Sequence, residues 1–220
     1  GDMVQHRKLI FQGSKLSYFL LFIIICPVWM NIDFMLELWL KNPPEYTSIF
    51  VRLALINMLI DSISGPLMIS AQSTGKIKWY QIIGGSFILL DLPISYFILT
   101  LFHKPEYSYY VTIGITFSSL MIRLFFLKSM VSLHVSDFFK KVFVRLLIVT
   151  FLSVAFMFGY PDMFKLDNKW LKLVLSSALI SIINVTLIVF FGFEKHERMA
   201  IKNLVVKQKK NNKIVANTIS

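Results

Sequence analysis

Residues 16–40 read LSYFLLFIIICPVWMNIDFMLELWL, and this stretch decides the class of the protein. No Lys, Arg, Asp or Glu occurs in it before Asp33. A helix needs about 20 mostly apolar residues to cross the roughly 30 Å hydrocarbon core of a bilayer. We therefore expect residues 16–40 to form a transmembrane helix.

The rest of the chain repeats this pattern, with short polar connections such as KNPPEY (41–46) and QSTGKIK (72–78) between apolar stretches. Backbone groups in lipid must be hydrogen-bonded internally, so helices are expected, and the roughly ten-residue alternating segments of a β-barrel do not occur. The predicted fold is an all-α, polytopic membrane bundle over residues 1–193. Its five further spans are 47–71, 79–102, 107–127, 138–160 and 170–193.

The composition excludes other classes. Of 220 residues, 56% are hydrophobic and 16% are charged, whereas a soluble domain carries about 25% charged residues. The net charge of +11 is spread between the apolar stretches, which favours an anionic membrane surface over nucleic acid as partner. The one cysteine, Cys26, excludes a disulfide framework and a cysteine metal site.

The distribution of Lys and Arg predicts the orientation. Fifteen lie on the side of the N-terminus, the second and fourth connections and the tail, and four lie on the other side. Basic connections stay in the cytoplasm, so both termini are predicted to be cytoplasmic, in agreement with an even number of spans. Residues 194–220 form a basic cytoplasmic tail, whose KQKKNNK stretch (207–213) either binds anionic lipid or is simply solvated.

Two carboxylates lie deepest in the predicted spans. Asp61 is roughly 21 Å from the outer start of its helix and Asp91 roughly 18 Å from the inner start of the next, at 1.5 Å per residue. Asn57 and Ser64 share the face of Asp61. The two carboxylates either face a water-filled cavity and take up a proton or sodium ion, or sit protonated between helices. No Lys or Arg is expected at the same depth.

Three arginines lie closer to helix ends. Arg52, Arg123 and Arg145 either extend to the headgroups or face a cavity, where a guanidinium can hold a phosphate. Asp33 and Glu37 are expected at the outer interface or at a cavity mouth.

Helix-breaking residues occur within three consecutive spans. Pro27, Pro66 and Pro93 are expected to kink their helices, either to line a transport site or as ordinary features of a membrane bundle. Gly65 beside Pro66 and the Gly84–Gly85 pair allow close backbone approach, with ordinary helix packing as the alternative.

Catalytic motifs are missing from the sequence. It contains no P-loop and no HExxH, and His6, His103, His134 and His196 lack metal-ligand spacing. The sequon at Asn184 falls within the last span. No enzyme and no cofactor are predicted.

Residues 36–99 resemble one region of bacterial polysaccharide exporters. The resemblance is carried by LWL (38–40), PEYT (44–47), AQSTGKIKWYQ (71–81) and LDLPISY (90–96), with Asp91 where Asn is expected. GSKLSYFLLF (13–22) and FGFEKHER (191–198) fit loosely. These exporters are the O-antigen and lipid-linked oligosaccharide flippases related to the multidrug and toxic compound extrusion (MATE) transporters.

The resemblance implies a MATE-like fold of two bundles around a central cavity, of which this chain looks like the C-terminal lobe. A missing N-terminal lobe is then a partner, and the absent initiator Met agrees with a gene fragment. The implied activity moves undecaprenyl-diphosphate-linked oligosaccharide across the bacterial inner membrane. Asp61, Asp91 and Asn57 are our candidates for ion coupling, and Arg52, Arg123 and Arg145 for the diphosphate.

Three other hypotheses stay open. A drug or metabolite antiporter of the same superfamily would need carboxylates and aromatic side chains rather than arginines. A membrane-embedded glycosyltransferase or acyltransferase would need His or paired acids in a surface loop, and the connections here are short. The last hypothesis is a remnant or assembly subunit that does not transport.

Overall fold

The computed structural model describes residues 2–75, 77–159, 168–194 and 197–199. These residues form helices and short connections, without a strand. Six helical stretches are long and apolar enough to cross a membrane, which confirms the all-α class and the number of spans. The stretches are Met3–Leu40, Thr47–Ser73, Tyr80–Phe102, Glu106–Met130, Val135–Gly159 and Lys169–Gly192.

The spans are built from eight α-helices and two π-helical turns in the described residues. In chain order they are α1 (Asp2–Leu40), α2 (Thr47–Ser73), α3 (Lys78–Leu89), α4 (Asp91–Phe102), α5 (Glu106–Met130), α6 (Val135–Phe138), η1 (Phe139–Phe143), α7 (Val144–Gly159), α8 (Lys169–Leu187) and η2 (Ile188–Gly192).

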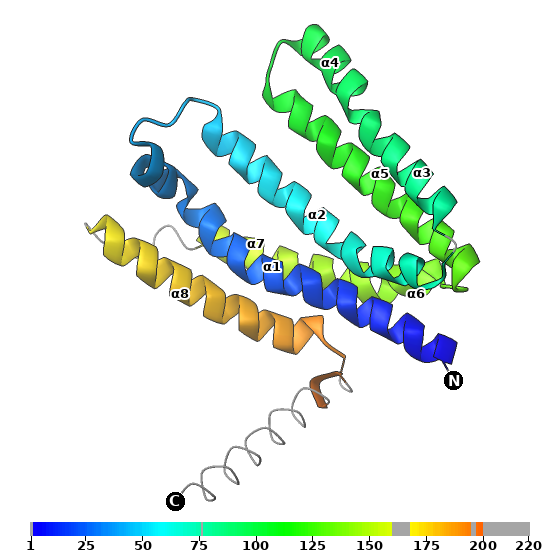
Figure 1. The fold of residues 1–220 in the computed structure, drawn as a ribbon. Coiled ribbons are helices and arrows are strands. Elements are labelled where there is room, and N and C mark those ends of the chain that lie inside the picture. Colours follow the sequence, from blue (N-terminus) through cyan, green and yellow to red (C-terminus); the bar gives the residue numbers. More distant parts are fainter. Residues whose placement is uncertain (1, 76, 160–167, 195–196, 200–220) are drawn as a thin grey trace, which may run out of the picture.

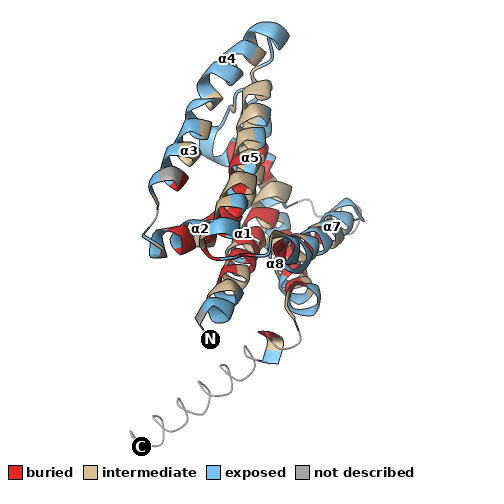
Figure 2. Ribbon diagram, turned by 90° about the vertical axis from the view of Figure 1, so that its right-hand side faces the viewer, coloured by how far each residue is buried: buried red, intermediate tan, exposed pale blue. Residues whose placement is uncertain are grey.

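The helices are arranged around α1 and α2. Helix α2 packs between α1 and α5, the α3–α4 span packs on the far side of α5, and α7 and α8 pack on the other side of α1 (Figure 1). Buried residues gather on α1, α2, α5, α7 and α8, whereas α4 has none (Figure 2). We call the end with the start of α1 and the α2–α3 and α5–α6 connections the basic end; it is the end predicted to be cytoplasmic.

Helix α1 begins well before its predicted membrane limit. It is continuous from Asp2, whereas hydropathy places the start of the span at residue 16. The additional turns extend α1 by roughly 21 Å at 1.5 Å per residue. Hydropathy detects where a helix enters lipid, not where it begins, and the early turns are held by protein contacts at the buried Ile10 and Ser14.

Of the three prolines, only Pro93 breaks its helix. Proline has no N–H, so the carbonyl of Leu89 loses its intrahelical partner. Helices α3 and α4 separate at Leu90, and bonding resumes with the 3.2 Å hydrogen bond from the Ile94 N–H to the Leu90 carbonyl. Helices α1 and α2 continue through Pro27 and Pro66.

Close approach of two helices occurs at a glycine that was not predicted. A Cβ on Gly13 of α1 would lie 3.1 Å from Cβ of Pro66 on α2. Next to it, the Ser14 hydroxyl donates a 3.1 Å hydrogen bond to the Ile63 carbonyl. Nothing in the described chain lies within 4 Å of a Cβ built on Gly65, Gly84 or Gly85, so no close approach occurs at these three glycines.

Three side-chain hydrogen bonds join α1, α7 and α8, and we call this set the polar seam. Tyr18 and Thr150 are 2.8 Å apart, Ser176 donates to Asn31 at 3.2 Å, and Ser153 donates to Asn184. Asn184 is 1% exposed, and the sequon lies within the last long apolar stretch, Lys169–Gly192. The seam fixes α7 and α8 against α1.

Candidate functional site: polar groups between α2, α3 and α5

An ion pair joins the neighbouring helices α2 and α5. Asp61 of α2 and Arg123 of α5 are 3.9 Å apart, and their side chains are 66% and 16% exposed. The expectation that no basic residue reaches the depth of Asp61 is therefore wrong. Counting residues along each helix ignores the length of the Arg side chain and the offset between neighbouring helices.

Further polar atoms lie one helical turn from this pair. Asn57 precedes Asp61 by four residues on α2, and Ser119 precedes Arg123 by four residues on α5. The two helices run in the same direction (Figure 1). Asn57 Oδ1, Ser119 Oγ and Arg123 Nε are buried and have no hydrogen-bond partner within the described part of the chain. Buried polar atoms of this kind call for water, an ion or a functional role.

Tyr80 brings α3 to the same region. Its ring lies edge-on to Phe126 of α5 at 6.2 Å between centroids, close enough to Arg123 for electrostatic interaction. The Tyr80 hydroxyl is also buried without a hydrogen-bond partner among the described residues. We call Asn57, Asp61, Tyr80, Ser119 and Arg123 the polar track. Tyr80 and Ser119 were not predicted, although the Ser119–Arg123 spacing was a usable signal.

Asp91 lies apart from the polar track. Thr112 of α5 donates a 2.9 Å hydrogen bond to one of its carboxylate oxygens, and Ser95 of α4 donates a 3.1 Å hydrogen bond to the other. Thr112 and Arg123 are eleven residues apart on α5, roughly 16 Å along the axis. The structure therefore does not bring the two predicted coupling carboxylates together.

Each of the three predicted anion-binding arginines is paired with a carboxylate. Besides the Asp61–Arg123 pair, Arg52 binds Asp33 at 2.8 Å and Arg145 binds Glu194 at 3.3 Å. Arg52 is near the start of α2 and Arg145 near the start of α7, at opposite ends of the bundle (Figure 1). They do not form one anion site, and their charges are balanced where they lie.

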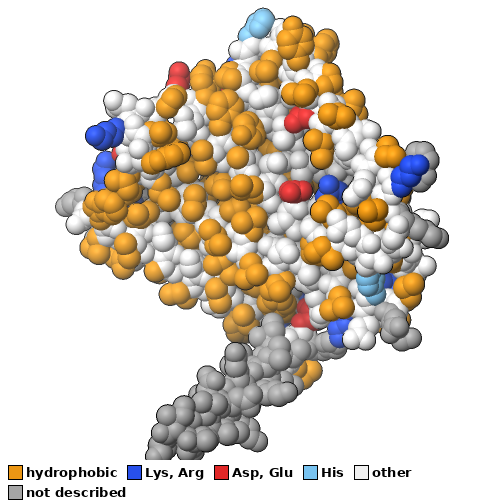
Figure 3. Space-filling model, viewed as in Figure 1, with side chains coloured by type: hydrophobic (Ala, Val, Ile, Leu, Met, Phe, Trp, Pro, Cys, Tyr) orange, Lys and Arg blue, Asp and Glu red, His pale blue; other side chains and the backbone are white. Residues whose placement is uncertain are grey.

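The surface over α2 and α5 is mostly hydrophobic. Figure 3 shows an acidic and a basic side chain side by side among hydrophobic ones over these helices. Within the described residues, no group of three or more His, Cys, Asp and Glu side chains could hold a metal ion. The polar track is thus an isolated set of charged and hydrogen-bonding groups on an apolar flank.

Glu194, Glu197 and Arg198, which follow η2, contact the basic end. Lys15 of α1 binds both carboxylate oxygens of Glu197 at 2.7 and 2.6 Å, with side chains 2% and 9% exposed. The Glu194 N–H donates to Glu197 at 2.8 Å. Burial raises the pKa of Glu197, but the Glu194 N–H, the charge and hydrogen bond of Lys15 and a hydrogen bond from Gln12 outweigh it, so the pKa is lowered.

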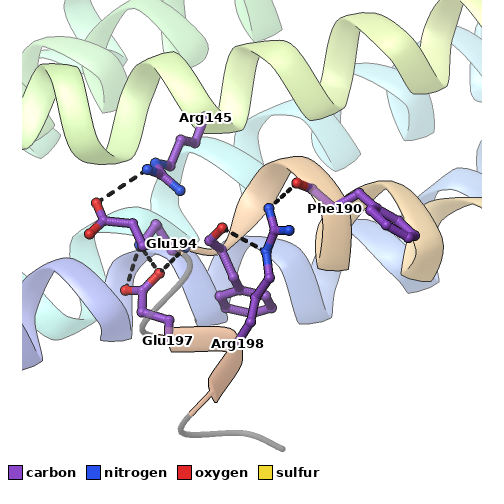
Figure 4. A network of polar contacts seen from close by, with 7 residues as sticks. Arg145, Phe190, Glu194, Glu197 and Arg198 are labelled. Carbon is purple, nitrogen blue, oxygen red and sulfur yellow. Dashed lines mark hydrogen bonds and ion pairs between the residues drawn. The ribbon is translucent and has the colours of Figure 1, made fainter.

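Arg198 completes this network. Its guanidinium donates to the carbonyls of Phe193, at 3.2 Å, and Phe190, which the end of a helix leaves without partners (Figure 4). Figure 4 also shows Arg145 of α7 reaching Glu194. Glu194, Glu197 and Arg198 of the predicted tail therefore pack on the bundle. The KQKKNNK stretch and the rest of 200–220 lie outside the described residues.

Comparisons with protein-family models, with curated proteins and with solved structures find no match.

Proposed function

We propose that this chain is the C-terminal part of a bacterial inner-membrane transporter that flips undecaprenyl-diphosphate-linked oligosaccharide. Six apolar helices, the basic residues predicted to be cytoplasmic, and the resemblance of residues 36–99 to polysaccharide exporters support the proposal. One observation carries it: the Asp61–Arg123 pair on the flank of the bundle, where Asp61 is 66% exposed.

The exposure of Asp61 argues that α2 and α5 do not face hydrocarbon. A charged side chain at mid-membrane costs a few kcal/mol on insertion scales, and such residues face a bundle interior or a water-filled cavity. A second bundle opposite α2 and α5 would enclose such a cavity. The partner in this proposal is therefore an N-terminal lobe.

The Asp61–Arg123 pair also offers a means of coupling proton uptake to substrate binding. In the ionised state Asp61 holds Arg123; when Asp61 takes up a proton from the aqueous phase, Arg123 is left with an unbalanced charge. A diphosphate can then bind the guanidinium through charge-assisted hydrogen bonds. Loss of the proton restores the Asp61–Arg123 pair and releases the diphosphate, so proton movement and substrate binding become linked.

The test is Asp61→Asn in the transporter that carries this chain, with Asp33→Asn as matched control. Asp33 is similarly exposed and is also paired with an arginine, but near the end of α1. Asp61→Asn should abolish gradient-dependent export of surface polysaccharide at normal expression, and Asp33→Asn should retain it. Unchanged polysaccharide in Asp61→Asn would remove Asp61 from the mechanism.

A second candidate is an antiporter for cationic drugs or metabolites. It is favoured by the carboxylate beside each predicted anion-binding arginine, because this pairing leaves little positive charge for a diphosphate. Arg123→Gln separates the two functions. Flipping of a diphosphate lipid should be lost in this variant, whereas export of a lipophilic dye cation should survive and should require Asp61.

A further inference from the structure

A second polar site lies at the end of the bundle opposite to the basic end. A cavity of about 270 Å³ opens between the last turns of α1 and the first turn of α8, which are neighbouring helices (Figure 1). Small-molecule pockets measure roughly 300–1,000 Å³, so this cavity suits a headgroup rather than a whole lipid. We call it the α1–α8 pocket. Its lining includes Met30, Asp33, Phe34 and Glu37 of α1 and Lys169 and Lys172 of α8.

The charged side chains of the pocket belong to two walls. On the α1 wall, Glu37 forms a 3.4 Å ion pair with Lys169 of the α8 wall, and the two side chains are 55% and 71% exposed. Lys172 is exposed and has no ion pair or side-chain hydrogen bond within the described part of the chain. Asp33 is bound by Arg52 at 2.8 Å, so its charge is balanced outside the pocket. One wall therefore offers a carboxylate and the other offers two ammonium groups.

The α1 wall already holds an ammonium group. Lys169 Nζ lies 3.4 Å from Glu37 Oε2 and 5.9 Å from the centroid of the Phe34 ring. A carboxylate and an aromatic face both attract an ammonium group. Because an exposed ion pair contributes little to stability, the ammonium group of a ligand can replace Lys169 there. Lys172 lies three residues after Lys169 on the same helical face, so the two lysines can then bind one phosphate together.

The level of the pocket indicates that the ligand is a lipid. Glu37 lies in the last turn of α1, and Lys169 and Lys172 lie in the first turn of α8. The ends of spanning helices meet the headgroup region of a bilayer, and the positive end of the α8 dipole favours a phosphate at this wall. Met30 lies roughly 10 Å deeper than Glu37 along α1, at 1.5 Å per residue, with Phe34 between them. Charged groups at the rim and apolar groups below match an amphipathic molecule.

We propose that the α1–α8 pocket binds the headgroup of phosphatidylethanolamine, with the ammonium group on Glu37 and the phosphate on Lys169 and Lys172. This inference does not depend on the proposed transport function. Phosphatidylcholine has no N–H group to donate to Glu37. Phosphatidylglycerol carries no cation, so its phosphate would leave Glu37 beside an anion. The site should therefore prefer phosphatidylethanolamine to both of these lipids.

The experiment measures lipid retention by the full chain in detergent, using native mass spectrometry. Phosphatidylethanolamine, phosphatidylcholine and phosphatidylglycerol with the same acyl chains are offered at equal concentrations. The wild type should retain phosphatidylethanolamine about fivefold more tightly than either of the others, because one charge-assisted hydrogen bond distinguishes them. Lys172→Gln removes a cation from the phosphate and should weaken retention of phosphatidylethanolamine about fivefold.

A second variant tests the ammonium contact. Glu37→Gln should abolish the preference for phosphatidylethanolamine over phosphatidylcholine. It also frees Lys169, so retention of phosphatidylglycerol should rise. The matched controls are Glu45→Gln and Lys104→Gln, which remove one exposed acid and one exposed lysine of the same end that do not line the pocket. Both controls should retain the three lipids as the wild type does.

Three results would overturn the inference. Equal changes in the test and control variants would show that general surface charge holds the lipid. Unchanged retention of phosphatidylethanolamine in Lys172→Gln would show that the pocket is not the site. A wild type that retains phosphatidylcholine or phosphatidylglycerol as tightly as phosphatidylethanolamine would remove the contact between Glu37 and the ammonium group.

A last arm separates a lipid headgroup from a soluble molecule with the same charges. Phosphoethanolamine is titrated against the complex of the wild-type chain with phosphatidylethanolamine. Displacement only at concentrations far above that of the lipid supports a headgroup site, because the acyl chains add to the affinity. Displacement at equal concentration would identify a site for a soluble zwitterion and would contradict the lipid assignment.

Discussion

The polar seam and the polar track use the same kinds of side chain in opposite ways. In the seam, each side chain has a partner across a helix boundary, as in Tyr18–Thr150 and Ser153–Asn184, and within the described residues only Asn184 Nδ2 is buried there without one. In the track, Asn57 Oδ1 and Ser119 Oγ have no hydrogen-bond partner in the described residues, and Arg123 is held by a 3.9 Å ion pair.

This difference distinguishes polar groups that stabilise helix packing from polar groups that can bind a ligand. A hydrogen bond between membrane helices contributes about 0.6 to 2 kcal/mol to stability, so polar groups that are paired hold helices together. Groups that are buried and unpaired contribute nothing of this kind and remain available to water, an ion or substrate. We therefore expect substitutions on the α1–α7–α8 side to change stability, and substitutions in the track to change function.

The largest expected effect is at the Lys15–Glu197 pair, which closes the α1 side at the basic end. Lys15→Met leaves the buried Glu197 carboxylate without its cationic partner, and breaking a buried ion pair in this way costs about 3–5 kcal/mol of unfolding free energy. Chemical unfolding in detergent micelles measures the loss. Lys15→Met/Glu197→Leu should recover most of it, because two apolar side chains replace the pair. A Lys15→Met variant as stable as wild type would show that the pair does not contribute.

The same pair should make stability depend on pH. The pKa of Glu197 is lowered from its ordinary value of 4.5 in the folded chain. The unfolded state then binds the proton more readily, so the contribution of Glu197 is present above pH 4.5 and is lost as the pH falls through the folded pKa. Unfolding followed as a function of pH should show this loss in the wild type. This loss of stability at low pH should be smaller in Lys15→Met/Glu197→Leu. If the two proteins lose stability equally at low pH, groups other than Glu197 cause the loss.

The sequence predicts the spans well because hydrocarbon imposes a simple rule. Apolar length alone identifies all six helices, and Pro93 indicates the break between α3 and α4. Neither the early start of α1 nor the close approach at Gly13 follows from hydropathy, because both depend on which surfaces of α1 and α2 meet. The glycines singled out by sequence lie instead where no described neighbour approaches.

The candidate site could be predicted only in part. Asp61, Asn57 and Arg123 were identified from their depth and charge, and the structure brings them together. Their partner Tyr80 has no distinguishing pattern. Lys15 and Glu197 are 182 residues apart, and the sequence places one directly before the first predicted span and the other in the predicted tail. Pairing between distant residues depends on helix packing, which one sequence without its fold does not specify.

The smallest expected effect compares one substitution in the two regions. Ser153 and Ser119 are both buried serines on spanning helices, one in the seam and one in the track. Ser153→Ala removes the partner of Asn184 and should cost about 1 kcal/mol of unfolding free energy. Ser119→Ala removes a hydroxyl without a hydrogen-bond partner in the described chain and should be neutral or slightly stabilising, while lowering transport through the track. Equal loss of stability in both variants would mean that Ser119 is bonded as Ser153 is, and the distinction between seam and track would fail.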